Sequence, residues 1–182
     1  LKYINDKKAE TNPAYWTCPG VTFSSINAGG GMALMASALD ASYLSGLAAK
    51  YALNAKDGFE ESENFPIFAK IENGKLIILK KCTVTINLAV SLNHAHPGHE
   101  SQSMASQIIL SREGRNTAIR TDVVEHGGSN RNRYSDRIGM RLNCYVTKLL
   151  KPKDEVHLLV CRWNEKAGEL LIGTDIVIFP TF

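Results

Sequence analysis

The feature that most constrains the fold is a run of strictly alternating side chains near the middle of the chain. Apolar residues occupy every second position between residues 83 and 92, and small or polar residues fill the positions between them. The apolar set is Val84, Ile86, Leu88, Val90 and Leu92. Successive side chains of an extended strand point to opposite faces, so a period of two predicts a strand with one buried face. We therefore expect a half-buried strand over residues 83–92.

Other strand-like segments surround this run and are divided by turn-forming residues. The dipeptide Asn73-Gly74, a strong hairpin signal, separates residues 65–72 from residues 76–80. Further strands are expected over residues 104–111, 117–125, 138–150, 156–163, 170–172 and 175–179. No helical pattern lies between these strands, which excludes a parallel α/β fold. The succession favours an all-β fold, an antiparallel jelly-roll β-sandwich or a related Greek key.

The first third of the chain has a different composition. Residues 1–62 are rich in Ala, Gly and Ser, with a short strand expected over 15–25 and a glycine break at 29–31. Helical spacing of apolar residues predicts one helix over roughly 38–54. We therefore expect an N-terminal strand and helical lead-in, residues 1–62, and a jelly-roll head domain, residues 63–182. The lead-in would be the end of a stalk or a segment packed on the head.

Composition excludes several classes of protein. The chain has 182 residues, of which 44% are hydrophobic and 21% charged, which suits one globular core. A net charge of +3 is too small to indicate a nucleic-acid partner, and no apolar run is long enough for membrane insertion. Four cysteines without a C-x-x-C pair indicate buried thiols. We expect Leu1, in place of Met, to mark a piece excised or processed from a longer chain.

Three local patterns carry a family resemblance. They are Asn73 to Ile78 leading into Thr83 to Leu92, the segment LLKPKDEVHLLV at 149–160, and Thr174 to Pro180. Together they resemble the globular heads of the tumour-necrosis-factor and complement-subcomponent superfamily, over about residues 64–182. Lys153 stands where that family commonly has Gly, and the last segment lacks the usual Ser, Phe and Gly residues.

The resemblance implies a compact homotrimer that presents loops at one end. An apolar C-terminal run with no cover of its own, residues 176–182, is a second reason to expect a trimer. The superfamily includes secreted animal proteins, bacterial surface filaments and the heads of phage and viral fibres. The chain lacks N-glycosylation sequons and a paired-cysteine framework, which disfavours the animal members. We therefore expect a fibre head on the virion surface, the alternatives being a bacterial cell surface or secretion.

One loop combines arginine with tyrosine and flexible glycine. Arg and Tyr suit recognition because each offers a rigid, amphipathic surface with directional donors. The candidates for contact with a host receptor or glycan are Arg131, Arg133, Tyr134 and Arg137. The alternatives are a soluble loop tip and a contact between subunits. Nearby carboxylates offset these arginines and aromatic platforms are scarce, so no nucleic-acid partner is expected.

A second loop holds three imidazoles within six residues: His94, His96 and His99. Such a group can bind zinc, with Glu100 or Glu125 as a fourth ligand. One histidine from each chain on a three-fold axis would make a shared site. The alternative is a solvated polar loop that binds no ion, in which case no cofactor is expected.

Enzyme motifs are missing from the sequence. Neither G-x-S-x-G nor H-E-x-x-H occurs, so no catalytic residues are assigned, and glycan hydrolysis is the enzymatic alternative. Two other functions compete with adhesion. One is a C-terminal trimerisation module that sets the assembly of a longer spike. The other is a metal-dependent or carbohydrate-binding sandwich.

Overall fold

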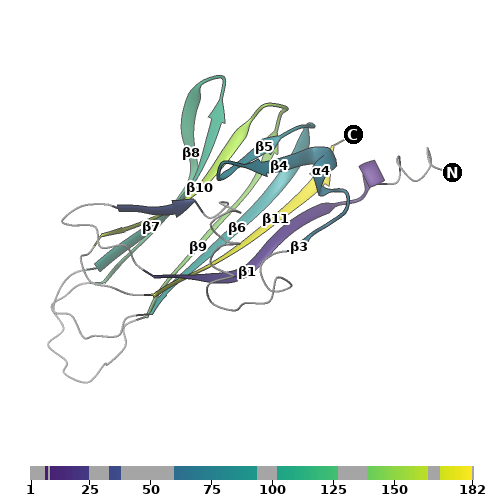
Figure 1. Cartoon of the computed structure of the whole chain (residues 1–182). Coiled ribbons are helices and arrows are strands. Elements are labelled where there is room, and N and C mark those ends of the chain that lie inside the picture. Colours follow the sequence, from purple (N-terminus) through teal and green to yellow (C-terminus); the bar gives the residue numbers. More distant parts are fainter. Residues whose placement is uncertain are drawn as a thin grey trace, which may run out of the picture.

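Two antiparallel β-sheets make up the structure, a computed structural model that describes residues 7, 9–24, 33–37, 60–93, 102–126, 139–163 and 169–181 (Figure 1). The elements are β1 (Ala14–Ser24), β2 (Ala33–Ser37), β3 (Glu60–Glu61), α4 (Phe65–Phe68), β4 (Ala69–Glu72), β5 (Lys75–Ile78), β6 (Cys82–Asn93), β7 (Gln102–Arg112), β8 (Arg115–His126), β9 (Gly139–Leu150), β10 (Glu155–Trp163) and β11 (Glu169–Pro180). One sheet has the order β3-β1-β11-β6-β9. The other has the order β4-β5-β10-β7-β8, with β2 also paired to β10. This confirms the expected all-β antiparallel sandwich.

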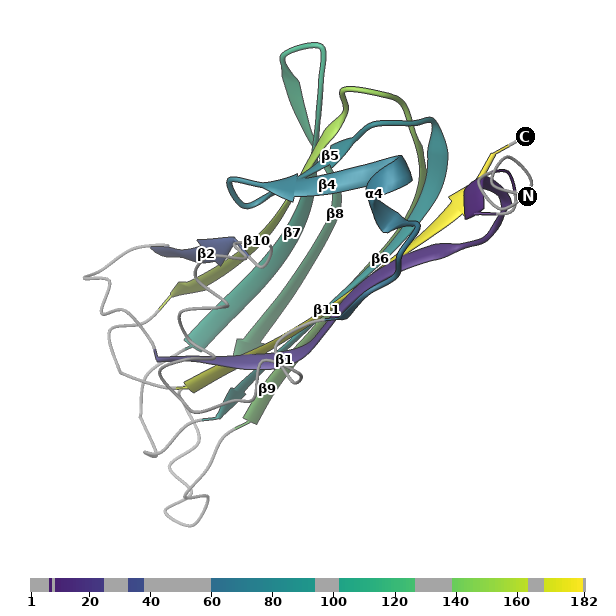
Figure 2. The ribbon, with the colours of Figure 1, turned by 45° about the vertical axis from the view of Figure 1, so that its right-hand side comes forward.

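Strand pairing is nested along the chain. β1 pairs with β11, β5 with β10, β6 with β9, and β7 with β8, each time antiparallel. Two further antiparallel pairs, β11 with β6 and β10 with β7, join these pairs into the two sheets. The first and last long strands therefore lie side by side in one sheet, and Figure 2 shows purple β1 running along yellow β11.

The core lies between the two sheets and is built from alternate residues. Val84, Ile86, Leu88 and Val90 of β6 are buried, as the alternating pattern predicted, and Cys82 at the start of the strand is buried with them. The side chain of Leu92 lies outside the described residues. Ile172, Ile176 and Ile178 of β11 are buried beside them. The other sheet contributes Leu76, Ile108, Leu110, Val156, Leu158 and Val160. Burying each of these aliphatic side chains contributes about 1.5–3 kcal/mol to the free energy of folding.

The expected boundary at residue 62 does not separate a lead-in from the head. β1 lies between β3 and β11 in the five-stranded sheet, and β2 pairs with β10. Trp16 and Cys18 are buried in the common core, while Tyr15 between the core positions is exposed. This is the same period of two as in β6, which the average composition of residues 1–62 conceals. The helix expected over 38–54 lies outside the described residues.

Two expected strands differ in detail from the structure. The segment 65–72 is extended only from Ala69, because Phe65–Phe68 forms one helical turn, α4. Pro66 lies in its first turn, where a missing backbone N–H removes no helical hydrogen bond. Phe65 and Phe68, three residues apart on the turn, are both buried in the core. The segments 170–172 and 175–179 belong to a single strand, β11.

Three turns use the left-handed backbone region. The hairpin β4–β5 turns through Asn73 and Gly74, with φ of 51° and 71°. The hairpin β7–β8 turns through Glu113 and Gly114, with φ of 51° and 75°. Positive φ at both central residues is what a type I′ turn requires. Lys153, between β9 and β10, has φ of 73°, and the resembling family commonly has Gly at this position, which adopts such a φ without a Cβ clash.

Candidate functional site

The two loops singled out from the sequence join strands at the same end of the sandwich. Residues 94–101 connect β6 to β7, and residues 127–138 connect β8 to β9. Asn93 is the register partner of Gly139, and Gln102 is the register partner of His126. In the five-stranded sheet, the end of β6 that leads into one loop is therefore paired with the start of β9 that follows the other loop. In the other sheet, the start of β7 is paired with the end of β8 in the same way.

The candidate side chains on these loops lie outside the described residues. They are His94, His96, His99, Glu100, Arg131, Arg133, Tyr134 and Arg137. For Glu125, the other candidate zinc ligand, the structure describes only the backbone, which belongs to β8. Zinc binding by one loop and ligand contact by the other accordingly stay predictions. Within the described ranges, no three His, Cys, Asp or Glu side chains gather into a group that could hold a metal ion.

The cysteines whose side chains are described behave as core residues. Cys18, Cys82 and Cys144 are buried and form no disulfide. Burial raises the pKa of the Cys82 thiol to about 11, because a thiolate would lose its hydration there. At neutral pH this side chain is therefore a protonated, small apolar group, as the sequence predicted.

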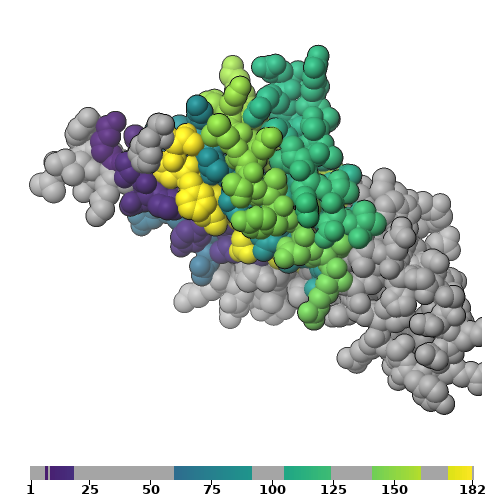
Figure 3. Space-filling model, turned by 180° about the vertical axis from the view of Figure 1, so that it is seen from behind, coloured from purple at the N-terminus to yellow at the C-terminus, as the bar shows by residue number. Residues whose placement is uncertain are grey.

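A surface that the sequence did not reveal covers the outer side of the five-stranded sheet. Four of the large apolar residues that are exposed in the structure lie on it, namely Tyr15 at 45%, Tyr145 at 56%, Leu149 at 46% and Phe179 at 44% exposure. Val177 lies between them, paired with Tyr15 on β1. We call these five residues the apolar face. Figure 3 looks onto this side, where purple β1, yellow β11, teal β6 and light green β9 follow one another.

Polar groups around the apolar face are mostly paired with each other. The Thr85 and Thr147 hydroxyl oxygens are 2.9 Å apart and share a hydrogen bond. The Thr17 hydroxyl donates to the Asp175 carboxylate. Asn87 lies between these pairs, and its buried Oδ1 accepts no hydrogen bond in the described part of the protein.

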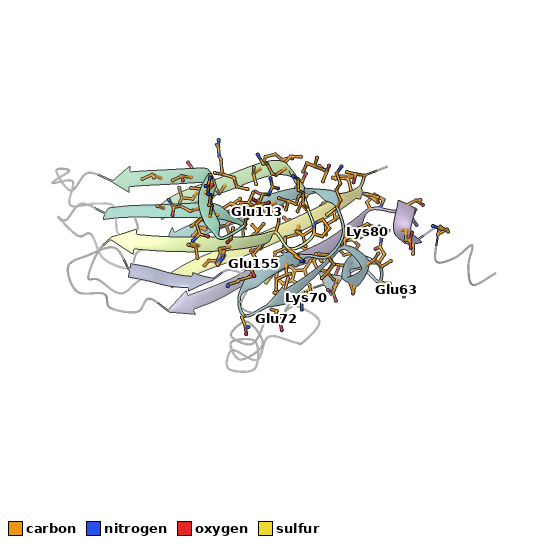
Figure 4. The ribbon with its side chains drawn as sticks, turned by 90° about the horizontal axis from the view of Figure 1, so that it is seen from above. Glu63, Lys70, Glu72, Lys80, Glu113 and Glu155 are labelled. Atoms are coloured by element: carbon orange, nitrogen blue, oxygen red, sulfur yellow. The ribbon has the colours of Figure 1, made fainter. Side chains whose placement is uncertain are left out.

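The outer side of the other sheet is different because it carries paired charges. Lys70 and Glu72 form an ion pair at 2.9 Å, and Lys75 and Glu155 form another at 3.4 Å. Figure 4 shows Lys70, Glu72 and Glu155 near one another on this side. The described charges on the outer side of the five-stranded sheet are Asp175, Arg141 and, on the edge strand β3, Glu60, and Lys148 is exposed on the other edge strand, β9. One outer side therefore suits water, and the other suits contact with protein.

A buried carboxylate fastens the turn between β9 and β10 to the end of β7. Asp154 is 3% exposed and accepts hydrogen bonds from Nε and Nη2 of Arg112 at 2.9 and 2.6 Å. It also accepts the backbone N–H of Lys151 at 2.8 Å. Burial alone would raise the pKa of the Asp154 carboxyl, but these hydrogen bonds and the neighbouring positive charges outweigh burial and hold the pKa below its usual range.

We expect Asp154→Asn to destabilise the protein by about 1–3 kcal/mol at pH 7, because it removes the charged acceptor of Arg112. Arg112 is partly exposed, so the loss should lie toward the lower end. A carboxyl with a depressed folded pKa stabilises the protein above its unfolded pKa, and this stabilisation is lost as pH falls through the folded pKa. The difference between wild type and variant should therefore shrink below about pH 4. Urea unfolding at several pH values measures it.

A matched control for this variant is Glu72→Gln, which breaks the exposed ion pair with Lys70. Exposed pairs of this kind contribute about 0–1 kcal/mol. The contrary result is that the two variants lose the same free energy of unfolding at pH 7, with the same dependence of that loss on pH. The contact between Asp154 and Arg112 would then have no special role in holding the turn.

Comparisons with other proteins add no identification. No known protein family matches the chain, and no curated protein matches it either. Among the helices of the described residues, none has the length and hydropathy needed to cross a bilayer.

Proposed function

We propose that the chain is a fibre-head domain, a jelly roll that forms a homotrimer and contacts a receptor or glycan on a host surface. The nested pairing of β1 with β11, β5 with β10, β6 with β9 and β7 with β8 supports the jelly-roll part of this proposal. A jelly roll has eight principal strands in two sheets, wound as two Greek keys. Nested antiparallel pairs are the connectivity expected from such winding.

The observation that carries the proposal is the apolar face. Soluble monomers rarely gather several exposed large apolar side chains on one surface, and such a patch is typical of a subunit contact. Here four of them share the outer side of one sheet, while the opposite side of the sandwich carries ion pairs. A second copy of this chain is the occupant we propose.

The C-terminal run does not contribute to this argument in the way the sequence suggested. Ile176 and Ile178 are fully buried within the chain, between β1 and β6. The expectation that this run lacks a cover is therefore wrong, because β11 is an inner strand of its sheet. Among the described residues of β11 after Ile176, Val177 and Phe179 point to the outer side of the sheet, where another chain can contact them.

The end at which the loops leave the sandwich supports the recognition part of the proposal. The loops β6–β7, β8–β9 and β10–β11 join strands at one end, and the tight turns at Glu113-Gly114 and at Lys153 join strands at the other. Loops on a rigid sandwich can vary without disturbing the core, which is why binding sites commonly lie on them. Three copies of each loop in a trimer would add avidity.

The test combines oligomeric state with attachment. Light scattering should show three chains per particle at micromolar concentration. Arg131→Ala and Tyr134→Ala should leave this mass and the melting temperature unchanged. Binding to immobilised glycans and to host cells should weaken by about thirtyfold if either residue supplies 2 kcal/mol of binding free energy. A monomeric wild type would contradict the trimer, and trimeric variants with normal attachment would favour the trimerisation module.

A further inference from the structure

A cavity of about 210 Å³ lies at the end of the sandwich where β1 begins and β11 ends. Four segments that are distant in sequence form its walls. The lining residues are Lys7, Glu10, Thr11, Phe68, Lys80, Lys81, Pro180 and Thr181. Figure 2 shows the purple N-terminal turn beside the end of yellow β11 at this place. The cavity is thus remote from the strand ends that carry the histidine and arginine loops, and it is independent of the proposed adhesion site.

The charges around the cavity do not balance. Of the described residues that line it, three are lysines and one, Glu10, carries a carboxylate. The Glu10 carboxylate contacts two of them, at 3.7 Å from Lys7 Nζ and 3.4 Å from Lys80 Nζ. In the described part of the chain, the ammonium of Lys81 has no carboxylate within ion-pair distance. Among the described lining residues, positive charge is therefore in excess, and the contact with Glu10 holds two of the ammonium groups at the cavity wall.

The remaining lining gives the cavity a defined shape. Phe68 is 1% exposed, so its ring belongs to the core rather than to a mobile surface group. The hydroxyl of Thr181 donates to the backbone oxygen of Lys81 at 3.0 Å, which fastens the chain after β11 to the link between β5 and β6. Thr11 and Pro180 complete the wall, and Pro180 adds apolar surface. Cationic groups beside an apolar wall are groups that recognise oxygen anions.

We propose that this cavity binds a small oxyanion, with Lys7, Lys80 and Lys81 as its cationic partners. Lysine contacts such groups as a compact point charge and does not require the planar geometry that arginine does. The shared chemistry is a negatively charged oxygen group. Inorganic phosphate, inorganic sulfate and the carboxylate of an acidic monosaccharide all carry it.

Isothermal titration of the full chain with phosphate, sulfate and glucuronate tests the proposal. We expect saturable binding of at least one of the three, weakened by Lys80→Gln and by Lys81→Gln about five- to tenfold each, and weakened by added sodium chloride. Glu10→Gln should have the opposite effect and strengthen binding severalfold, because it removes the carboxylate that competes for Lys7 and Lys80. Tighter binding of glucuronate than of both inorganic ions would identify a sugar acid as the ligand class, and the reverse order a free inorganic anion.

The matched control is Lys70→Gln, which removes an exposed lysine on the charged outer side, away from the cavity. It should leave each dissociation constant unchanged. Melting temperatures of all variants should agree with wild type within about 2 °C, since the substituted lysines are largely exposed. Absence of saturable binding, or equal weakening by Lys70→Gln and Lys80→Gln, would overturn the proposal, as would weaker binding by Glu10→Gln.

Discussion

Tyr145→Asp is expected to convert the protein from trimers into folded monomers. Tyr145 is 56% exposed in the single chain and lies on the outer side of β9, the edge strand that bounds the proposed contact. An aspartate there would bring one unpaired carboxylate per chain into a contact that excludes water. The effective cost of burying each such charge is several kcal/mol, and a trimer would contain three of them. In the single chain the carboxylate faces water, so the fold should not change.

The control for this experiment is Val123→Asp. Val123 is exposed to a similar extent, 50%, but lies on β8 in the other sheet. Light scattering should show one chain per particle for Tyr145→Asp and three for Val123→Asp, while circular dichroism stays the same for both. A Tyr145→Asp protein that keeps three chains per particle would locate the subunit contact away from the apolar face.

Ile176→Ala is expected to lower the free energy of unfolding by about 2–5 kcal/mol, because it opens a cavity in the core. Ile176 is fully buried, with β1 on one side and β6 on the other. Val177→Ala, at the adjacent residue, removes two methyl groups from the apolar face and should cost the monomer less than about 1 kcal/mol. Urea unfolding in the Tyr145→Asp background measures both, because trimerisation would otherwise make the midpoint depend on concentration.

The same pair of residues separates folding from assembly. Deleting residues 176–182 removes buried and outward side chains together, so loss of trimers in that variant would not show which role failed. Equal destabilisation of the monomer by Ile176→Ala and Val177→Ala would contradict a core position for Ile176 and an outward position for Val177.

The local elements were predictable because the pattern that forms a strand or a tight turn lies within the residues of that element. The period of two in β6 and the Asn-Gly turn between β4 and β5 each depend on neighbouring positions, and both are present in the structure. Membership of β1 in the central sheet was not predictable in this way. Its partner β11 lies more than 150 residues away, as the pairing of Ala14 with Ile178 shows. The composition of residues near β1 cannot predict a pairing with a strand so distant in sequence.

The candidate surfaces also differ in whether local sequence or long-range strand pairing determines them. The histidine and arginine loops were selected by residue type, and the structure adds that their flanking strand ends are paired. The apolar face could not be selected, because Tyr145 and Leu149 alternate with core residues of β9 and only the register with β6 and β11 gathers them beside Phe179. The contact between Arg112 and Asp154 joins residues 42 positions apart. No sequence pattern within either segment predicts this contact.

The inner position of β11 has a consequence for the order in which the molecule can form. During synthesis, β11 is the last strand of the sandwich to leave the ribosome, yet β1 and β6 both need it as their neighbour. Until β11 emerges, the edges of β1 and β6 that it pairs with stay open, and the core in which Trp16 is buried is incomplete. Folding dominated by such distant pairings is slow, and exposed strand edges at that stage favour aggregation. Yield in a cell should therefore depend on chaperones that hold the nascent chain until its C-terminal strand is available.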